Sequence, residues 1–129
     1  MARQEQIQAR EKWTTALLSG KYKQVKGALH SVGEGHCCLG VACEVYNEDH
    51  EIKREVLPSR YHGTSYFLAC ESYDGESTLL PLSVQHWLGL KSNNGSYLTG
   101  TLTHDNDNGK SFAEIAAIIK SEPSGLFIE

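Results

Sequence analysis

The first part of the chain has the hydrophobic spacing of an amphipathic helix. Across residues 3–19, Ile7, Trp13 and Leu17 recur on one side, with Gln, Glu and Arg at many of the remaining positions. Gly20 follows and is expected to end the helix, because glycine readily adopts the left-handed conformation found at helix C-termini. The pattern predicts an N-terminal helix with Trp13 on its buried side.

A second helix is predicted near the C-terminus from its capping residues. Ser111 and Glu114 have the spacing of a capping box, in which each side chain accepts a hydrogen bond from the other residue's backbone N–H. The helix should therefore begin at Phe112, place Ile115 in the core and end before Pro123.

Two further helices are predicted in the middle of the chain. Residues 36–46 are apolar on almost every side, so a helix here would be nearly buried, and Gly40 within it indicates close contact with another backbone. Residues 84–88 favour a short helix, with Ser83 as its N-cap and Gly89 as its stop.

The segments between these helices carry strand and turn patterns. Residues 22–32 alternate loosely and favour a strand or a twisted hairpin arm before a turn at residues 33–35. Residues 64–70 are rich in strand-forming side chains, and Asp74–Gly75 offers a hairpin turn toward residues 78–80. Two β-hairpins are therefore expected.

Three polar or mixed segments complete the chain. Residues 47–55 are charged and are expected to form a surface loop that ends at Leu57–Pro58. Residues 97–103 favour a short strand, and residues 105–109 favour a tight polar turn.

The order of these elements predicts the α+β class. Strands that follow one another through hairpin turns favour an antiparallel sheet of hairpins, packed here against three to four helices. With 129 residues, 40% hydrophobic and 22% charged, the chain has the length and composition of one small globular domain over residues 1–129.

Charge and hydropathy exclude two classes of partner. The formal net charge is -4, and a net-negative chain without a basic stripe gains little from releasing the counterions of long nucleic acid. No apolar run is long enough to cross a bilayer, and the first residues lack the apolar stretch of a secretion signal. We therefore expect a cytoplasmic protein that binds neither long nucleic acid nor membranes.

The four cysteines, of which Cys37 and Cys38 are adjacent, are expected to be free thiols packed in the core. Two alternatives stay open. Cys37 or Cys38 could be the nucleophile of a hydrolase or transferase, because a helix N-terminus lowers a thiol pKa and a histidine could act as base. A zinc-stabilised module is the other alternative, with ligands drawn from one set of residues: His30, His36, Cys37, Cys38, Cys43 and Cys70.

The spacing of these six residues is unlike that of the usual structural zinc sites, and no local signature surrounds the thiols. The sequence therefore assigns no catalytic residue, no metal ion and no cofactor, and it favours a protein that is not an enzyme.

The segment around Tyr22 combines lysines with an aromatic face, which can hold a phosphate and stack a base. Asp105 begins a polar turn that fails the ligand pattern of a calcium loop but could still contact a ligand. We predict a ligand-binding surface of five residues: Tyr22, Gln24, Lys26, Asp105 and Asn106. The simpler alternatives are an edge strand protected by lysines and a turn whose Asx side chains bond their own backbone.

Three motifs occur in a fixed order. Residues 12–24 hold a Trp helix and Gly-Lys-Tyr-x-Gln, residues 37–43 read Cys-Cys-Leu-Gly-Val-Ala-Cys, and residues 106–116 read Asn-Asp-x-Gly-x-Ser-Phe-x-Glu-Ile-Ala. This combination resembles a group of small proteins encoded by tailed bacteriophages and prophages. Residues 80–90 also match that group, whereas residues 47–77 follow no common pattern. The group supplies a setting and no established reaction.

The resemblance implies an accessory role in the cytoplasm of an infected host cell. Small phage proteins of this kind often act by binding, either inhibiting a host defence protein or sequestering a small nucleotide-like signal. The expected partner is therefore a host protein or a small phosphate-bearing molecule, and the binding surface could extend across a homo-oligomer.

Overall fold

The structure is a computed structural model that describes residues 3–60 and 67–128. Within these residues the helices are α1 (Gln4–Leu18), α2 (Cys38–Asp49), α3 (Leu82–Leu88), α4 (Leu102–Asp107) and α5 (Phe112–Ser121). The strands are β1 (His30–Ser31), β2 (Gly35–His36), β3 (Arg54–Arg60), β4 (Phe67–Tyr73), β5 (Ser96–Tyr97) and β6 (Gly100–Thr101). The chain has the α+β class that the sequence predicts.

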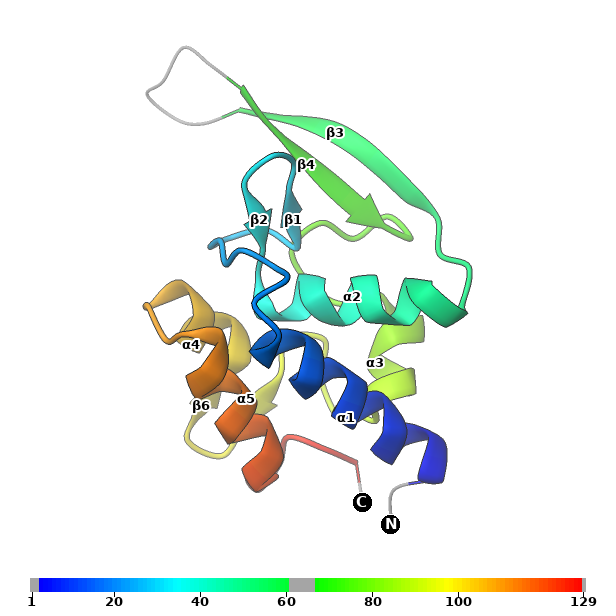
Figure 1. The fold of residues 1–129 in the computed structure, drawn as a ribbon, viewed down its shortest axis with the longest axis vertical. Helices are drawn as coiled ribbons and strands as arrows, with labels where there is room; N and C mark the ends of the chain where they lie inside the picture. The colour runs from blue at the N-terminus through cyan, green and yellow to red at the C-terminus, as the bar shows by residue number, and fades with distance from the viewer. Residues whose placement is uncertain (1–2, 61–66, 129) are drawn as a thin grey trace.

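The sheet and most of the helices lie on opposite sides of α2, as Figure 1 shows. Four strands form an antiparallel sheet in the order β2-β1-β4-β3, and β5 and β6 form a separate two-stranded sheet. The long β3–β4 hairpin extends beyond the short β1–β2 hairpin and away from the helical body (Figure 1). The sheet is therefore an appendage of the helices rather than their central layer.

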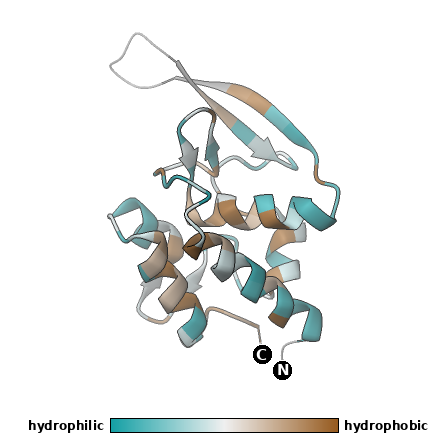
Figure 2. Cartoon of the chain, in the orientation of Figure 1, coloured by the Kyte–Doolittle hydropathy of each residue, from teal (hydrophilic) through white to brown (hydrophobic). Residues whose placement is uncertain are grey.

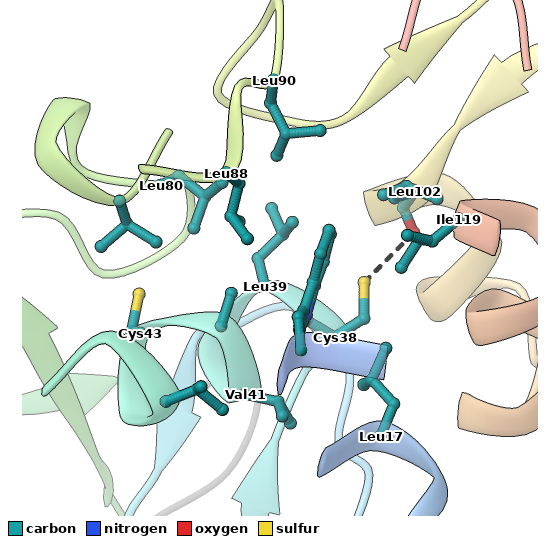
Figure 3. Close-up of a cluster of buried hydrophobic side chains, with 14 of the residues drawn as sticks. Leu17, Cys38, Leu39, Val41, Cys43, Leu80, Leu88, Leu90, Leu102 and Ile119 are labelled. Carbon is teal, nitrogen blue, oxygen red and sulfur yellow. Dashed lines mark hydrogen bonds between the residues drawn. The ribbon is translucent and has the colours of Figure 1, made fainter. Parts of the chain in front are cut away.

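The core forms around α2, where residues 38–43 are all buried. Side chains from α1, α3, α4 and α5 converge on this helix, and the close-up of Figure 3 shows several of them around Leu39. Trp13 of α1 is completely buried, and its indole N–H donates to the Cys38 carbonyl oxygen at 2.9 Å. Figure 2 shows hydrophobic residues in α1, α2 and α5, which contribute side chains to this core.

Gly40 has the backbone contact that its position in an apolar helix predicts. A Cβ atom at this position would lie 1.7 Å from the carbonyl oxygen of Leu29, just before β1. The chain segment that leads into the sheet therefore crosses directly over α2, and only glycine leaves room for it.

The helices that carry local end signals are confirmed. Ser111 Oγ accepts from Glu114 N at 3.2 Å and Glu114 Oε1 accepts from Ser111 N at 3.0 Å, which is the predicted capping box. Gly89 ends α3 in the left-handed conformation. The predicted N-cap of α3 is wrong, because Pro81 occupies that position and Ser83 lies inside the helix.

The strand predictions between α1 and α3 are confirmed in part, since a hairpin turn joins β1 to β2 near residues 33–35 and β4 covers residues 67–70 of the predicted strand. Only His30 and Ser31 of residues 22–32 form a strand, because the earlier part of this segment makes a single bridge from Gln24 to His36 and is otherwise bonded to α4. Residues 47–55 are not one loop, since α2 continues to Asp49 and β3 begins at Arg54. The partner of β4 is β3 rather than residues 78–80.

Two further corrections concern the ends of these segments. Asp74–Gly75 does form a turn, but only a single bridge between Tyr73 and Glu76 follows it. Residues 105–109 are not a free turn, because α4 runs to Asp107. Residues 64–66 of the predicted strand lie outside the described residues. In the part of the chain that is described, no helix is long and apolar enough to span a membrane.

Candidate functional site

Polar side chains gather where the sheet meets α2. They come from five elements and are linked to one another by hydrogen bonds and ion pairs. We call this group the histidine–carboxylate cluster, and its members are His30, His36, Glu44, Arg54, Glu71 and Tyr73.

The two histidines are brought together by the register of β1 and β2. His30 lies directly opposite His36, whose backbone N–H and C=O bond to Lys23 and Val25 rather than to β1. The two histidines are therefore a non-hydrogen-bonded pair, in which cross-strand side chains approach most closely. Their rings stack with centroids 4.0 Å apart and an angle of 5° between their planes.

The pairing of β3 with β4 supplies the next members of the cluster. Arg54 lies opposite Tyr73, and Glu71 is the neighbour of His30 across β1 and β4. Alternate residues of a strand share one face of the sheet, so Glu71 and Tyr73 point to the same side. Glu44 approaches from α2.

Arg54 links the two carboxylates. Its Nε and Nη2 donate to Glu71 at 2.8 and 2.6 Å, and its Nη1 and Nη2 donate to Glu44 at 3.3 and 2.5 Å. The Tyr73 hydroxyl also donates to Glu44. On the other side, His30 Nδ1 lies 2.7 Å from Glu71 Oε1 and His36 Nε2 lies 3.3 Å from Glu44 Oε2.

These bonds shift the pKa values of the cluster in opposite directions. Burial opposes the ionisation of Glu44, but hydrogen bonds from His36 and Tyr73 and the charge of Arg54 outweigh it and lower its pKa to about 2. The pKa of Glu71 is lowered in spite of burial by hydrogen bonds from Arg54 and His30. The pKa of Arg54 is raised, chiefly by its bond to Glu71, and burial raises that of Tyr73.

The cluster therefore holds two ionised carboxylates, one guanidinium ion and one protonated phenol at neutral pH. None of these four groups is poised to exchange a proton near neutrality, as a general acid or base must be. One ligand atom each from His30, His36 and Glu44 lies within 4.8 Å of the other two, so these three residues could hold a metal ion.

Most of the chain matches one known protein family. The model of the family described as "Domain of unknown function (DUF8296)" matches residues 4–123. The chain belongs to this family. Comparisons with curated proteins and with solved structures returned no match. The range matched to DUF8296 contains all six residues of the histidine–carboxylate cluster.

The adjacent thiols of this DUF8296 chain lie in the core, as expected. Cys37 is 5% exposed, and Cys38 is completely buried with its Sγ 3.7 Å from the Leu102 carbonyl oxygen (Figure 3). Burial raises the pKa of Cys37 to about 11 and raises the pKa of Cys38 as well. The effect of burial outweighs the lowering of the thiol pKa by the backbone N–H groups at the helix N-terminus. The arrangement favours packing over thiol chemistry.

The metal-capable group differs from the zinc ligands considered from the sequence. Within residues 3–60 and 67–128, the group that could hold an ion contains His30 and His36 but none of the cysteines. The sequence gives no sign that the third member, Glu44, could be a metal ligand, because it does not show that α2 turns this side chain toward the histidines.

The structure brings together two of the five predicted ligand-binding residues. Gln24 Nε2 donates to Asn106 Oδ1 at 2.8 Å, and Asn106 Nδ2 donates to the Val25 carbonyl oxygen at 2.7 Å. Asn106 Oδ1 also accepts from Cys38 N at 3.2 Å. Both amides are thus engaged in fastening the segment before β1 to α4 and α2.

The other three predicted residues lie apart. Asp105 is buried and accepts from the Tyr97 hydroxyl at 2.5 Å, while Lys26 is exposed. Tyr22 is half-buried and lines an open groove of about 540 Å³ between α1 and α2, with Lys21 beside its ring. Ligand binding by these residues stays a prediction.

Part of the cluster had a signal in the sequence. His30 and His36 are placed symmetrically around Gly33, and the observed turn at residues 32–34, one residue earlier than predicted, sets them side by side. Arg54 and Glu71 have no such signal, because residues 47–55 are expected to form a loop and the strand predicted over residues 64–70 stops before Glu71.

Proposed function

We propose that the protein acts by non-catalytic binding of a protein partner, with the β3–β4 hairpin as its recognition element. The observation that carries this proposal is the exposed middle of β3, where Val56 is 57% and Leu57 is 41% exposed. Figure 2 shows this hydrophobic segment on the hairpin, away from the helical core. Exposed apolar side chains on a projecting element are typical of protein interaction sites.

The chemistry of the remaining molecule supports binding rather than catalysis. Cys37 and Cys38 are buried with raised pKa values, and the cluster's carboxylates and guanidinium ion are paired with one another. These groups are consequently engaged in holding the structure together.

The edge of β3 favours contact through side chains over addition of a strand. Ala69 lies opposite Pro58, and its carbonyl oxygen accepts from Val32 N on the β1 side at 2.8 Å. Main-chain groups alternate in direction along antiparallel strands, so those of Pro58 point to the open edge. Proline has no N–H to offer there, which weakens this edge as a template for another strand.

The partner that fits the resemblance to phage accessory proteins is a protein of the bacterial host, inhibited by occupation of its surface. Neighbouring residues of a strand point to opposite faces of the sheet, so Val56 and Leu57 lie on the two faces of the hairpin, and this partner would contact both of them around the open edge of β3.

The experiment compares two changes of exposed apolar residues. The double variant Val56→Ser/Leu57→Ser should lose the partner that cross-linking and affinity capture identify with the wild-type chain. Leu98→Ser is the matched control, because Leu98 is 80% exposed in the turn between β5 and β6. Equal affinity of the double variant and the wild type for that partner would contradict the proposal.

A second candidate function has one observation in its favour. The groove between α1 and α2 is large enough for a nucleotide-sized ligand, and Tyr22 and Lys21 line it together with Lys12. An aromatic ring and ammonium groups can bind a base and a phosphate, so the groove is the place to test sequestration of a small signal. Tyr22→Ala should abolish nucleotide binding measured by calorimetry, whereas the hairpin double variant should leave it unchanged.

A further inference from the structure

The histidine–carboxylate cluster has an excess of negative charge. With neutral imidazoles, its two ionised carboxylates and one guanidinium ion leave one negative charge. The side chains involved are only 11% to 29% exposed, so water screens this charge less than at an open surface. This negative charge attracts a cation to the cluster.

The donor atoms match one class of cation. Two imidazoles and one carboxylate suit zinc and the neighbouring divalent transition metals rather than calcium or magnesium, which prefer oxygen ligands. Two ligands about 2.1 Å from a tetrahedral ion lie about 3.4 Å apart. The 3.3 Å between His36 Nε2 and Glu44 Oε2 already meets this requirement.

We propose that His30, His36 and Glu44 bind one divalent transition-metal ion, with Zn²⁺ as the representative. Glu71 accepts from His30 Nδ1 and so fixes this ring, as carboxylates commonly do for metal-bound histidines. Arg54 Nη1 holds the other oxygen of Glu44 at 3.3 Å, which keeps that carboxylate in place. Three protein ligands leave a coordination position for water or for a group on a partner.

Binding requires one movement of the side chains. The imidazole planes are parallel within 5°, and a nitrogen lone pair lies in the plane of its ring, so the two lone pairs do not converge while the rings are stacked. Because Glu71 holds the His30 ring, the His36 ring must turn about its Cβ–Cγ bond when the ion binds. The ion then takes the place of the proton between His36 Nε2 and Glu44, and that proton leaves or moves to Nδ1. In the metal-free protein the two rings are stacked, because the non-hydrogen-bonded register holds the two histidines close together.

The ion would connect the two parts of the molecule. His30 and His36 belong to β1 and β2, and Glu44 belongs to α2, while Arg54 and Glu71 join the same cluster to the β3–β4 hairpin. A metal ion here therefore fastens the sheet to the helical body. Val56 and Leu57 supply no ligand to the ion, so failure of the metal site would leave the proposed hairpin function untouched.

The test uses the whole chain after treatment with a chelator that is then removed. Titration with Zn²⁺ should show one ion per chain by calorimetry, and the melting temperature should rise with Zn²⁺ concentration. His30→Gln, His36→Gln and Glu44→Gln should each weaken binding at least about tenfold. His86→Gln is the control, because His86 is exposed on α3, and it should bind as the wild type does.

Two spectroscopic measurements need no variant. The side-chain NMR signals of His30 and His36 should shift in the wild-type chain on addition of Zn²⁺. Co²⁺ should give the visible spectrum of a nitrogen- and oxygen-ligated ion without a thiolate band, since the cysteines of α2 are buried. Absence of binding, affinities unchanged in all three ligand variants, or a thiolate-to-cobalt band would each overturn the proposal.

Discussion

At the scale of single residues, Asn106 shows how a polar side chain can be essential without touching a ligand. It is 1% exposed, and its amide bonds to Gln24, to the Val25 carbonyl oxygen and to the Cys38 N–H. The sequence predicts Asn106 as a ligand-binding residue, whereas in the structure its amide bonds to buried backbone groups. An amide can make either kind of hydrogen bond. Its partners became visible only with the packing of α4 against α2.

Replacing Asn106 by Ala should therefore destabilise the fold. The Val25 carbonyl and the Cys38 N–H would lose their side-chain partner, and each buried polar group left without a partner costs roughly 1–3 kcal/mol. We expect the free energy of unfolding in urea to fall by about 2–4 kcal/mol. Asn93→Ala is the control, since Asn93 is exposed and should change stability by less than about 0.5 kcal/mol. Equal stabilities of the two variants would refute this role.

Gly40 is the second residue whose role depends on close packing. Gly→Ala within a helix normally stabilises by up to about 1 kcal/mol, but here the new Cβ would meet the Leu29 carbonyl oxygen at 1.7 Å. Gly40→Ala should therefore lower the melting temperature strongly or prevent folding. Gly75→Ala offers the comparison, because its φ is +87° with nothing within 4 Å, so only backbone strain of about 1–2 kcal/mol is expected.

At the scale of elements, the packing of α2 determines which cysteines are accessible to a thiol reagent. Cys37, Cys38 and Cys43 are buried on or beside this helix, whereas Cys70 on β4 is partly exposed. With its pKa near 11, Cys37 is about one part in a thousand thiolate at about pH 8. A thiol reagent should therefore label Cys70 first in the native protein and the other three only after denaturation, as mass spectrometry would show. Native labelling of Cys37 or Cys38 at the rate of Cys70 would contradict this.

The elements also show why some of the fold was predictable. The ends of α5 and α3 are encoded locally, by Ser111 with Glu114 and by Gly89, and such signals act within a few residues. The β3 strand has no comparable local signal, because Arg54 and Glu55 are charged and Pro58 normally disfavours strands. Its pairing depends on β4, which lies across a connection that local patterns do not describe.

The contrast between local signals and non-local pairing also explains which residues of the histidine–carboxylate cluster the sequence indicates. His30 and His36 are separated by one tight turn and are both among the ligands that the sequence offers, but their pairing depends on the exact turn, and the rest of the cluster requires the non-local β1–β4 and β3–β4 registers. Glu44 additionally requires the orientation of α2 beneath the sheet. Sequence patterns therefore reached the part of the cluster with local contacts and missed the part assembled by tertiary structure.

At the scale of the whole molecule, the last residues close the helical body. The family model matches as far as residue 123, yet Leu126 is completely buried and Phe127 is 7% exposed. Phe127 pairs with Leu90, and the guanidinium of Arg10 lies 3.7 Å from the centre of its ring. The C-terminal segment thus joins α1 to the residues that follow α3.

A chain cut after Pro123 should consequently be much less stable than the whole chain, although it keeps all five helices of the described residues. Burial of a large apolar side chain contributes about 1.5–3 kcal/mol, so loss of Leu126 and Phe127 should lower the free energy of unfolding by about 3–6 kcal/mol. The control is Ile128→Ser, because Ile128 is 47% exposed and its backbone N–H to the Gly89 carbonyl oxygen is kept. A truncated chain as stable in urea as this control would show that the segment only covers a body already stable without it.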